Sequence, residues 1–316
     1  MTEVVVVGSY VQDLAFRTTT FPNPGETRIG TFAAGPGGKG FNQAIACSRL
    51  GVQTAFLAAV GNDGFAREVQ NFLRQETLDA RFETVNDRST GAASILVNQA
   101  GQNLITVALG ANDAFSPEFV LTHEDLFRDA AIVVAQLECN LAPVRKAFAL
   151  GKKYGAKLIL NPAPINPLVD AALLHSADVL VPNETETQFL MEHIYGRQIS
   201  ADLAKASDSD LSEIASALSS ATVIITLGAA GAFVKPATGR VFRVPAIEVA
   251  AIDTSGAGDA FTGALAAGML RFPHAIESAV RFAVVAAGLS TQRQGTAPAM
   301  PHYHEVEAHW EARASA

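Results

Sequence analysis

The chain has 316 residues, of which 49% are hydrophobic and 17% are charged, and its net charge is −8. This apolar content is enough to bury a large core, and the acidic balance without a basic block argues against nucleic acid or an anionic membrane surface as partner. No apolar run reaches the ~18 residues that a membrane span requires. Cys47 and Cys139 lie among apolar neighbours, and no signal-peptide pattern precedes the first apolar run. We therefore expect a soluble, cytoplasmic protein with reduced thiols.

Strand-like and helix-like segments alternate along the chain. Near-continuous apolar runs occur at 4–7, 54–60, 131–137, 157–162, 178–182 and 222–228. Between them lie segments with a helical spacing of apolar residues, at 42–51, 65–76, 141–155, 184–194 and 210–221. Continuous apolar runs are typical of strands that are buried on both faces, and their alternation with helices predicts a parallel sheet covered by helices. We expect one α/β domain over residues 1–316.

Two segments, 12–34 and 90–108, depart from this pattern. They contain the stretches TRIGTF, ASILVN and NLITVA, in which polar and apolar residues alternate, and residues 98–102 read as a hairpin turn between the last two. These features predict a small antiparallel sheet with one exposed face, inserted into the main fold as a lid. Its free edges and apolar side chains need a cover.

The heptapeptide DTSGAGD, residues 253–259, lies where a loop turns into a helix. Backbone N–H groups at a helix start have no partner within the helix and attract anions, and Gly256 and Gly258 allow a phosphate to approach the main chain closely. Asp259 would repel such a phosphate unless it takes a proton from an attacking hydroxyl. The motif therefore suggests phosphoryl transfer to an alcohol, and its simpler interpretation is a capped helix.

A second glycine-rich motif, GPGGKGFN at 35–42, satisfies the dinucleotide-binding pattern G-x-G-x-x-G, and Asp63 follows at a suitable distance. That interpretation would make the protein a nicotinamide-dependent oxidoreductase. The run before Gly35 alternates, however, instead of forming the buried first strand which that fold requires. Lys39 and Asn42 suit a polyhydroxylated ligand better, because they offer hydrogen-bond donors and an acceptor. No Walker A motif occurs in the sequence.

Together, GGKGFN and DTSGAGD resemble the two signatures of the ribokinase-like (PfkB) carbohydrate kinases, and their spacing is most similar to that of the ribokinases. Shorter matches occur in the family's order at residues 8–13, 24–27, 136–138, 161–164, 182–186 and 226–228, so the resemblance covers nearly the whole chain. It implies a three-layer α/β fold with a β lid. It also implies ATP-dependent phosphorylation of the primary hydroxyl of a furanose. The first candidate is D-ribose, which would become ribose 5-phosphate.

The resemblance also implies roles for individual residues. Asp259 would be the general base, and the backbone N–H groups of Gly256, Ala257 and Gly258 would form the anion hole. The sugar would be held by Asp13, Gly38, Lys39, Asn42 and Glu138. The nucleotide would be held by Asn183, Glu186, Thr226, Gly228 and Gly258, with Val284 and Ala287 beside the adenine and Glu186 holding Mg²⁺ through water. Simpler interpretations stay open, among them a capping role for Glu186 and a core position for Val284.

A monovalent cation site and a dimer are further implications of the resemblance. Potassium would lie in a loop beside the anion hole, and its ligands would be Asp253 and the carbonyls of Ser255, Ser290, Arg293 and Gly295. Ala299 departs from the family because ribokinases often carry a serine at this position. A homodimer would form by pairing two lids across a two-fold axis.

Other departures concern the substrate. Val11 stands where some ribokinases carry an asparagine, and Phe41 stands where a small residue is common. These changes leave a nucleoside, deoxyribose or fructose open as the acceptor. A phosphosugar is disfavoured, because the lid segments add only Arg17 and Arg28 as cations. A non-catalytic sugar or nucleotide sensor is the alternative of another class, and its marker would be the loss of Asp259 or of the anion-hole glycines.

Overall fold

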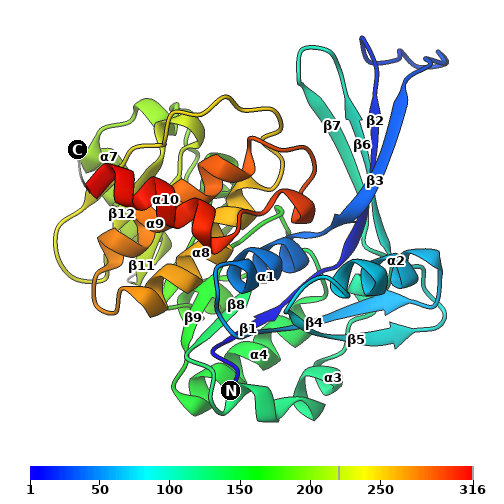
Figure 1. The fold of residues 1–316 in the computed structure, drawn as a ribbon. Helices are drawn as coiled ribbons and strands as arrows, with labels where there is room; N and C mark the ends of the chain where they lie inside the picture. The colour runs from blue at the N-terminus through cyan, green and yellow to red at the C-terminus, as the bar shows by residue number, and fades with distance from the viewer. Residues whose placement is uncertain (220, 315–316) are drawn as a thin grey trace.

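The computed structural model describes residues 1–219 and 221–314, and within them the largest element is a nine-stranded sheet (Figure 1). Its spatial order is β13 (Phe242–Val244), β12 (Ala232–Lys235), β11 (Thr222–Thr226), β10 (Val179–Leu180), β9 (Lys157–Leu160), β8 (Ile132–Ala135), β1 (Val4–Val7), β4 (Thr54–Gly61) and β5 (Asp79–Val85). Within these residues β12 runs opposite to the other eight strands, which are parallel to one another. The six predicted buried strands are confirmed as β1, β4 and β8 to β11, whereas the edge strands β5 and β13 and the strand β12 next to β13 were not predicted.

Helices cover both faces of this sheet, as expected (Figure 1). The sheet separates two buried apolar clusters, and alternating residues of β1 show this: Val4 and Val6 belong to one cluster, and Val5 and Val7 belong to the other. The first cluster is completed by α1 (Lys39–Arg49), α2 (Gly64–Leu73), α8 (Ala257–Arg271), α9 (Ile276–Ser290) and α10 (Tyr303–Ala314). The second is completed by α3 (Pro117–Thr122), α4 (Leu141–Tyr154), α5 (Ala171–Ser176), α6 (Glu184–Tyr195) and α7 (Asp208–Leu218). The predicted three-layer α/β class is thus confirmed.

A second, four-stranded sheet projects from the main body (Figure 1). We call it the small sheet; its spatial order is β3 (Thr31–Gly37), β2 (Val11–Arg17), β6 (Gly91–Val97) and β7 (Asn103–Ala108). Each hairpin is antiparallel, and the predicted turn at 98–102 joins β6 to β7. The two outgoing strands, β2 and β6, pair in parallel because both hairpins leave the main sheet in the same direction. The predicted TRIGTF strand begins only at Thr31, after a loop that contains Pro22 and Pro24, residues that cannot donate to a ladder.

Strand order places the carboxyl ends of β1 and β8 side by side at a switch in chain direction, since the chain proceeds from β1 to β4 on one side and later returns to β8 on the other. Open α/β sheets bind ligands at such points. Both cysteines are free and buried, and burial raises the pKa of each thiol to about 12. No helix in the described part of the chain has the length and apolar character to cross a membrane.

Close packing of α1 against α8 depends on Gly263. A Cβ at this position would lie 2.3 Å from the backbone oxygen of Gln43 and 2.8 Å from the Cβ of Ala46. Because α1 and α8 also carry the polar residues at the sheet's carboxyl edge, this contact fixes the distance between the two helix starts.

Gly263→Ala is expected to lower the free energy of unfolding by about 1–3 kcal/mol, since overpacking a tight helix contact forces backbone shifts. Gly64→Ala, at the start of α2, is the matched control, because its nearest neighbour would be the end of Arg67 at 3.9 Å. Chemical denaturation of both variants measures the difference. Equal stability of the two variants would contradict the packing argument.

Candidate active site

A polar hollow of about 150 Å³ lies at the carboxyl edge of the main sheet. Residues from five separate parts of the chain line it: Lys39, Asn161, Ala163, Val181, Asn183, Glu186, Thr226, Thr254, Gly256, Ala257, Gly258 and Asp259. Eight of these are residues for which the sequence predicted a role. The fold therefore brings the beginning of α1, the ends of β9 to β11 and the beginning of α8 to one place.

Asp259 lies in the first turn of α8, and only 4% of its surface is exposed. Each carboxylate oxygen accepts one amide hydrogen bond, Oδ2 from Asn42 Nδ2 at 2.9 Å and Oδ1 from Gln43 Nε2 at 3.0 Å. Both donors come from the first turns of α1, so the helix contact described above also fixes the direction of this carboxylate. A buried carboxylate held by neutral donors remains available as a proton acceptor.

A chain of amides behind Asp259 was not assigned a role from the sequence. Gln43 Nε2 also approaches Asn161 Oδ1 at 3.1 Å, and Gln43 Oε1 accepts from Gln136 Nε2 at 2.6 Å. Asn161 in turn donates to the carbonyl of Val181. Gln136 and Asn161 follow strands β8 and β9 and lie within the short family matches at 136–138 and 161–164, while Gln43 adjoins the GGKGFN motif; these positions are the sequence signals that point to them.

The start of α8 has the geometry expected of an anion site. Gly256 adopts a left-handed conformation with φ of 76°, which favours glycine, and it precedes the first helical residue. The N–H of Ala257 has a long contact of 3.3 Å with the carbonyl of Thr254. Within the described residues no acceptor is found for the N–H of Gly256 or of Gly258, so these donors are open to a ligand.

Lys39, the first residue of α1, lines the hollow and makes no ion pair with any side chain that the structure describes. Burial alone would lower the pKa of its ammonium, but four surrounding carboxylates outweigh this effect and raise the pKa: Asp259, Glu138, Glu186 and Asp13. The ammonium thus stays charged without a fixed partner, which suits it to an anionic or hydroxylated ligand.

Two of these carboxylates are fixed by neutral donors from distant parts of the chain. Glu138 is buried, and its Oε2 accepts from Ser9 Oγ at 2.6 Å and from the backbone N–H of Lys39 at 2.8 Å. Asp13, on β2, accepts a hydrogen bond of 2.8 Å from Thr296 Oγ1 at its Oδ2. Burial raises the pKa of Asp13 to about 7, and nearby carboxylates act in the same direction while the Thr296 bond acts against them. Neither Ser9 nor Thr296 was predicted.

Three acceptor atoms in this region lack a donor in the part of the chain that the structure describes. Asn42 Oδ1 is buried and unpaired, and neither Glu138 Oε1 nor Asp13 Oδ1 receives a hydrogen bond. All three belong to residues that the sequence assigned to the sugar. A buried acceptor without a donor, such as Asn42 Oδ1, costs free energy, and the two open carboxylate oxygens can accept further hydrogen bonds, so the three atoms fit a ligand that brings several hydrogen-bond donors.

The predicted nucleotide residues meet the hollow only in part. Asn183 and Glu186 line it, and they form a reciprocal capping box at the start of α6, with bonds of 2.8 Å in each direction. Burial raises the pKa of Glu186. Thr226 ends β11 in the hollow, whereas Gly228, at φ of 52°, is not among the lining residues. Val284 is buried in the first apolar cluster with Ala287 packed against it, so a contact of either with adenine stays a prediction.

The predicted cation loop is held together mainly through Asp253. Its Oδ1 accepts from the N–H of Ser255 at 3.0 Å, and its Oδ2 accepts from the N–H of Gly295 at 3.2 Å. Arg17, on β2, forms an ion pair of 3.4 Å with the same Oδ2. Ala299 is buried and has no hydroxyl. The described residues contain no group of three or more His, Cys, Asp or Glu side chains that is arranged to hold a metal ion.

Comparison with known proteins agrees with this geometry. Residues 1–302 match the model of the pfkB family of carbohydrate kinases. The chain is 34% identical to ribokinase of Schizosaccharomyces pombe, over 97% of each chain, and 35% identical to deoxyribokinase of Salmonella typhi, over 95% of each. Its fold is similar to that of Arabidopsis thaliana ribokinase complexed with ribose and ATP, with a TM-score of 0.81, 28% identity and 98% coverage of both chains. The chain therefore belongs to the pfkB family of carbohydrate kinases and is an ATP-dependent sugar kinase of the ribokinase-like type.

Proposed function

We propose that this kinase transfers the γ-phosphate of ATP to the primary hydroxyl of a furanose, D-ribose, and forms ribose 5-phosphate and ADP. The observation that carries the proposal is the set of donor-free acceptors on Asn42, Glu138 and Asp13 beside the carboxylate of Asp259. A sugar supplies several hydroxyl donors at close spacing, and a carboxylate oxygen accepts from them well. The ribokinases among the relatives support ribose as the first candidate.

The catalytic step follows from the position of Asp259. Its carboxylate accepts the proton of the primary hydroxyl while that oxygen forms a bond to the γ-phosphorus, and the bond from phosphorus to the bridging β,γ oxygen breaks to release ADP. The N–H groups of Gly256 and Gly258, with the weakly engaged N–H of Ala257, are placed to stabilise the negative charge of the transferred group. Lys39, which also lines the hollow, adds a positive charge.

We assign the nucleotide and its magnesium ion to the part of the hollow that is lined by the start of α6 and the end of β11. Asn183 and Thr226 would contact the phosphates, Gly228 the ribose, and Val284 the adenine. The residues fit magnesium, which Glu186 would hold through water. The carboxylates around the hollow outnumber its one lysine, and Mg²⁺ is usually bound by one or two carboxylates together with waters and substrate phosphates. When bound, the ion neutralises charge on the β- and γ-phosphates. Glu186 can hold the ion through water and cap α6 at the same time, because a carboxylate has more acceptor sites than the two hydrogen bonds from Asn183 use.

Potassium is proposed for the loop that contains Asp253. Its ligands would be the Asp253 carboxylate and the carbonyls of Ser255, Ser290, Arg293 and Gly295, and Ala299 contributes no hydroxyl. The arrangement fits a weakly held cation, because Arg17 already pairs with Asp253 and competes for the same oxygen. The small sheet that carries Arg17 would act as a lid, closing over the sugar and excluding water from the reaction.

A second candidate acceptor is 2-deoxyribose. The deoxyribokinase relative is as similar to this chain as the ribokinase relative, and the donor-free acceptors do not by themselves demand a 2-hydroxyl group. Nucleosides and fructose are less well supported by the relatives but share the primary hydroxyl that the reaction needs.

ATP-dependent ADP release across ribose, deoxyribose, fructose, several nucleosides and fructose 6-phosphate, each with and without potassium, tests the proposal. We expect the highest kcat/KM with ribose and a rise in rate with KCl at constant ionic strength. A preference for another acceptor would reject ribose while keeping the phosphoryl-transfer assignment. No ADP release with any acceptor would reject the proposed function.

Asp259→Asn is expected to lower turnover by about 10²- to 10⁴-fold, the usual worth of a general base, with sugar affinity largely retained. Asp79→Asn, on the far edge strand β5, is the matched control and should keep wild-type turnover because its partner Arg81 lies outside the hollow. Steady-state rates and calorimetric sugar binding provide the two readouts. Near-normal turnover of Asp259→Asn would remove it from the role of base.

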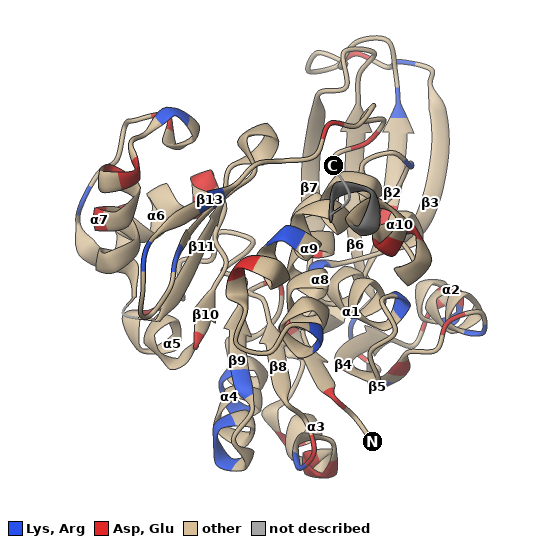
Figure 2. Ribbon diagram, turned by 60° about the vertical axis from the view of Figure 1, so that its left-hand side comes forward, with Lys and Arg blue, Asp and Glu red and all other residues tan. Residues whose placement is uncertain are grey.

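The outer face of the small sheet supports a homodimer. Ladder pairing places four apolar side chains in one row across the sheet, Phe32, Phe16, Leu96 and Leu104, and Phe16, Phe32 and Leu104 are 42%, 58% and 54% exposed. The four strands carry few charged residues (Figure 2), and these are Asp13 and Arg17. The alternation of strand residues puts both on the face opposite the apolar row. An uncharged apolar row on a sheet face suits a second copy of itself across a two-fold axis.

Phe32→Glu is expected to weaken the dimer roughly 100-fold or more, because the two-fold axis doubles the loss of apolar burial and brings two charges into the interface. Ile29→Glu, in the 98% exposed loop position outside the row, is the control and should leave the dimer intact. Light scattering after size exclusion, over a range of protein concentrations, measures the mass against the 33.1 kDa of one chain. A monomeric wild type, or an unaffected Phe32→Glu variant, would contradict the proposed interface.

A further inference from the structure

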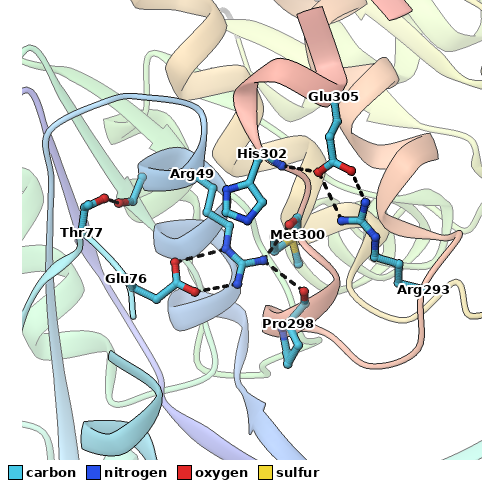
Figure 3. Close-up of polar contacts among 9 residues, drawn as sticks. Arg49, Glu76, Thr77, Arg293, Pro298, Met300, His302 and Glu305 are labelled. Atoms are coloured by element: carbon cyan, nitrogen blue, oxygen red, sulfur yellow. Dashed lines mark hydrogen bonds and ion pairs between the residues drawn. The ribbon is translucent and has the colours of Figure 1, made fainter. Parts of the chain in front are cut away.

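The segment 291–300, between α9 and α10, is held rigidly from its outer side (Figure 3). Arg49, at the end of α1, donates to the carbonyls of Pro298 at 3.0 Å and Met300 at 2.7 Å. The same guanidinium pairs with Glu76 at 2.6 Å, and the two side chains are only 9% and 8% exposed. A buried, bidentate pair of this kind has little freedom to move. The segment is therefore a fixed support rather than a free loop.

The inner side of this segment presents Thr296 to the small sheet. Its buried hydroxyl lies 2.8 Å from Asp13 Oδ2 and 3.3 Å from the carbonyl of Pro36. A hydroxyl has one proton to donate, and the shorter contact to a charged acceptor is the stronger one. Gly37 leaves room for the carboxylate, because a Cβ there would lie 2.2 Å from Asp13 Oδ2. Thr296 thus fixes one oxygen of Asp13 and leaves Oδ1 without a donor from the described residues.

The charges around Asp13 make this neutral donor important. Three carboxylates act on it: Glu138 after β8, Asp259 in α8 and Asp253 before α8. Neither nearby cation pairs with Asp13, since Arg17 pairs with Asp253 and Lys39 forms no ion pair with the described side chains. Burial and these carboxylates raise the pKa of Asp13 to about 7, and the hydrogen bond from Thr296 is the contact that lowers it.

We propose that Thr296 is a positioning residue for sugar binding: anchored through Arg49, it orients the Asp13 carboxylate so that Oδ1 accepts from a sugar hydroxyl. The inference rests on the proposed function, because it takes Asp13 as a sugar ligand. Thr296 acts through Asp13 and does not take part in phosphoryl transfer, which occurs at Asp259. Its loss therefore changes the sugar KM and the protonation of Asp13, and it leaves the chemical step in place.

The test compares Thr296→Val, which keeps the branched shape without a donor, with Thr296→Ser, which keeps the donor. Rates are measured at saturating KCl from pH 5.5 to 9, because Thr296 adjoins the proposed cation loop. For Thr296→Val we expect a sugar KM raised roughly 10- to 100-fold, as for a lost hydrogen bond to a charged group, with kcat and the ATP KM within about threefold of wild type. Thr296→Ser should restore the sugar KM.

The pH profile separates this role from a merely structural one. Sugar binding needs the ionised carboxylate, so kcat/KM for the sugar falls as pH drops through the pKa of Asp13. Removing the Thr296 donor favours the protonated form, and the acidic limb of Thr296→Val should move to higher pH by up to about one unit. Thr296→Ser should keep the wild-type limb.

Each outcome has one meaning. A Thr296→Val variant with wild-type sugar KM and an unshifted limb would overturn the inference, even if its melting temperature falls. A loss confined to kcat would overturn it as well. A wild-type enzyme without activity on any sugar would instead reject the proposed function, and the sugar role of Thr296 with it.

Discussion

Excess negative charge around one buried lysine is the constraint on which this structure depends. Four carboxylates act on a single lysine, Lys39, at the carboxyl edge of the main sheet. None of them forms a fixed ion pair with that lysine within the described residues; each is held by neutral donors instead, amides for Asp259, a hydroxyl and a backbone N–H for Glu138, the capping box for Glu186 and a hydroxyl for Asp13. Neutral donors fix the direction of a carboxylate without cancelling its charge. The hollow thus keeps both a directed base and an uncommitted cation, which phosphoryl transfer between two bound ligands requires.

The local patterns of the sequence predicted those parts of this arrangement that local physics determines. Continuous apolar runs located the buried strands, and the glycines of 253–259 marked the left-handed turn before α8. Asn183 and Thr226 were expected at the carboxyl edge of the sheet because each lies at the end of a predicted strand. The contact between Thr296 and Asp13 joins residues 283 positions apart, and the amides of Gln43, Gln136 and Asn161 meet only after three elements have packed. Nothing in a short window encodes such contacts. The parallel pairing of β2 with β6 was missed for the same reason.

Strand alternation gives the small sheet two unlike faces. One face of β2 directs Asp13 and Arg17 toward the segment 291–300 and the loop before α8, while the other contributes Phe16 to the exposed apolar row. Because a one-residue shift in register would exchange these faces, ligand binding and the proposed dimer depend on the same ladder. Arg49 and Thr296 secure the inner side of that ladder from the main body, so the base of the small sheet is fixed even though its tip projects from the molecule (Figure 1).

The burial of both native cysteines makes the protein convenient for spectroscopy. Cys47 and Cys139 are the chain's two thiols, and burial holds the pKa of each near 12, so neither presents a reactive thiolate to reagents in neutral solution. A cysteine introduced at the exposed Ala100, in the turn at the tip of the small sheet, would be labelled selectively without removal of the native residues. Fluorescence or spin labels attached there would test whether this sheet moves when sugar and nucleotide are added.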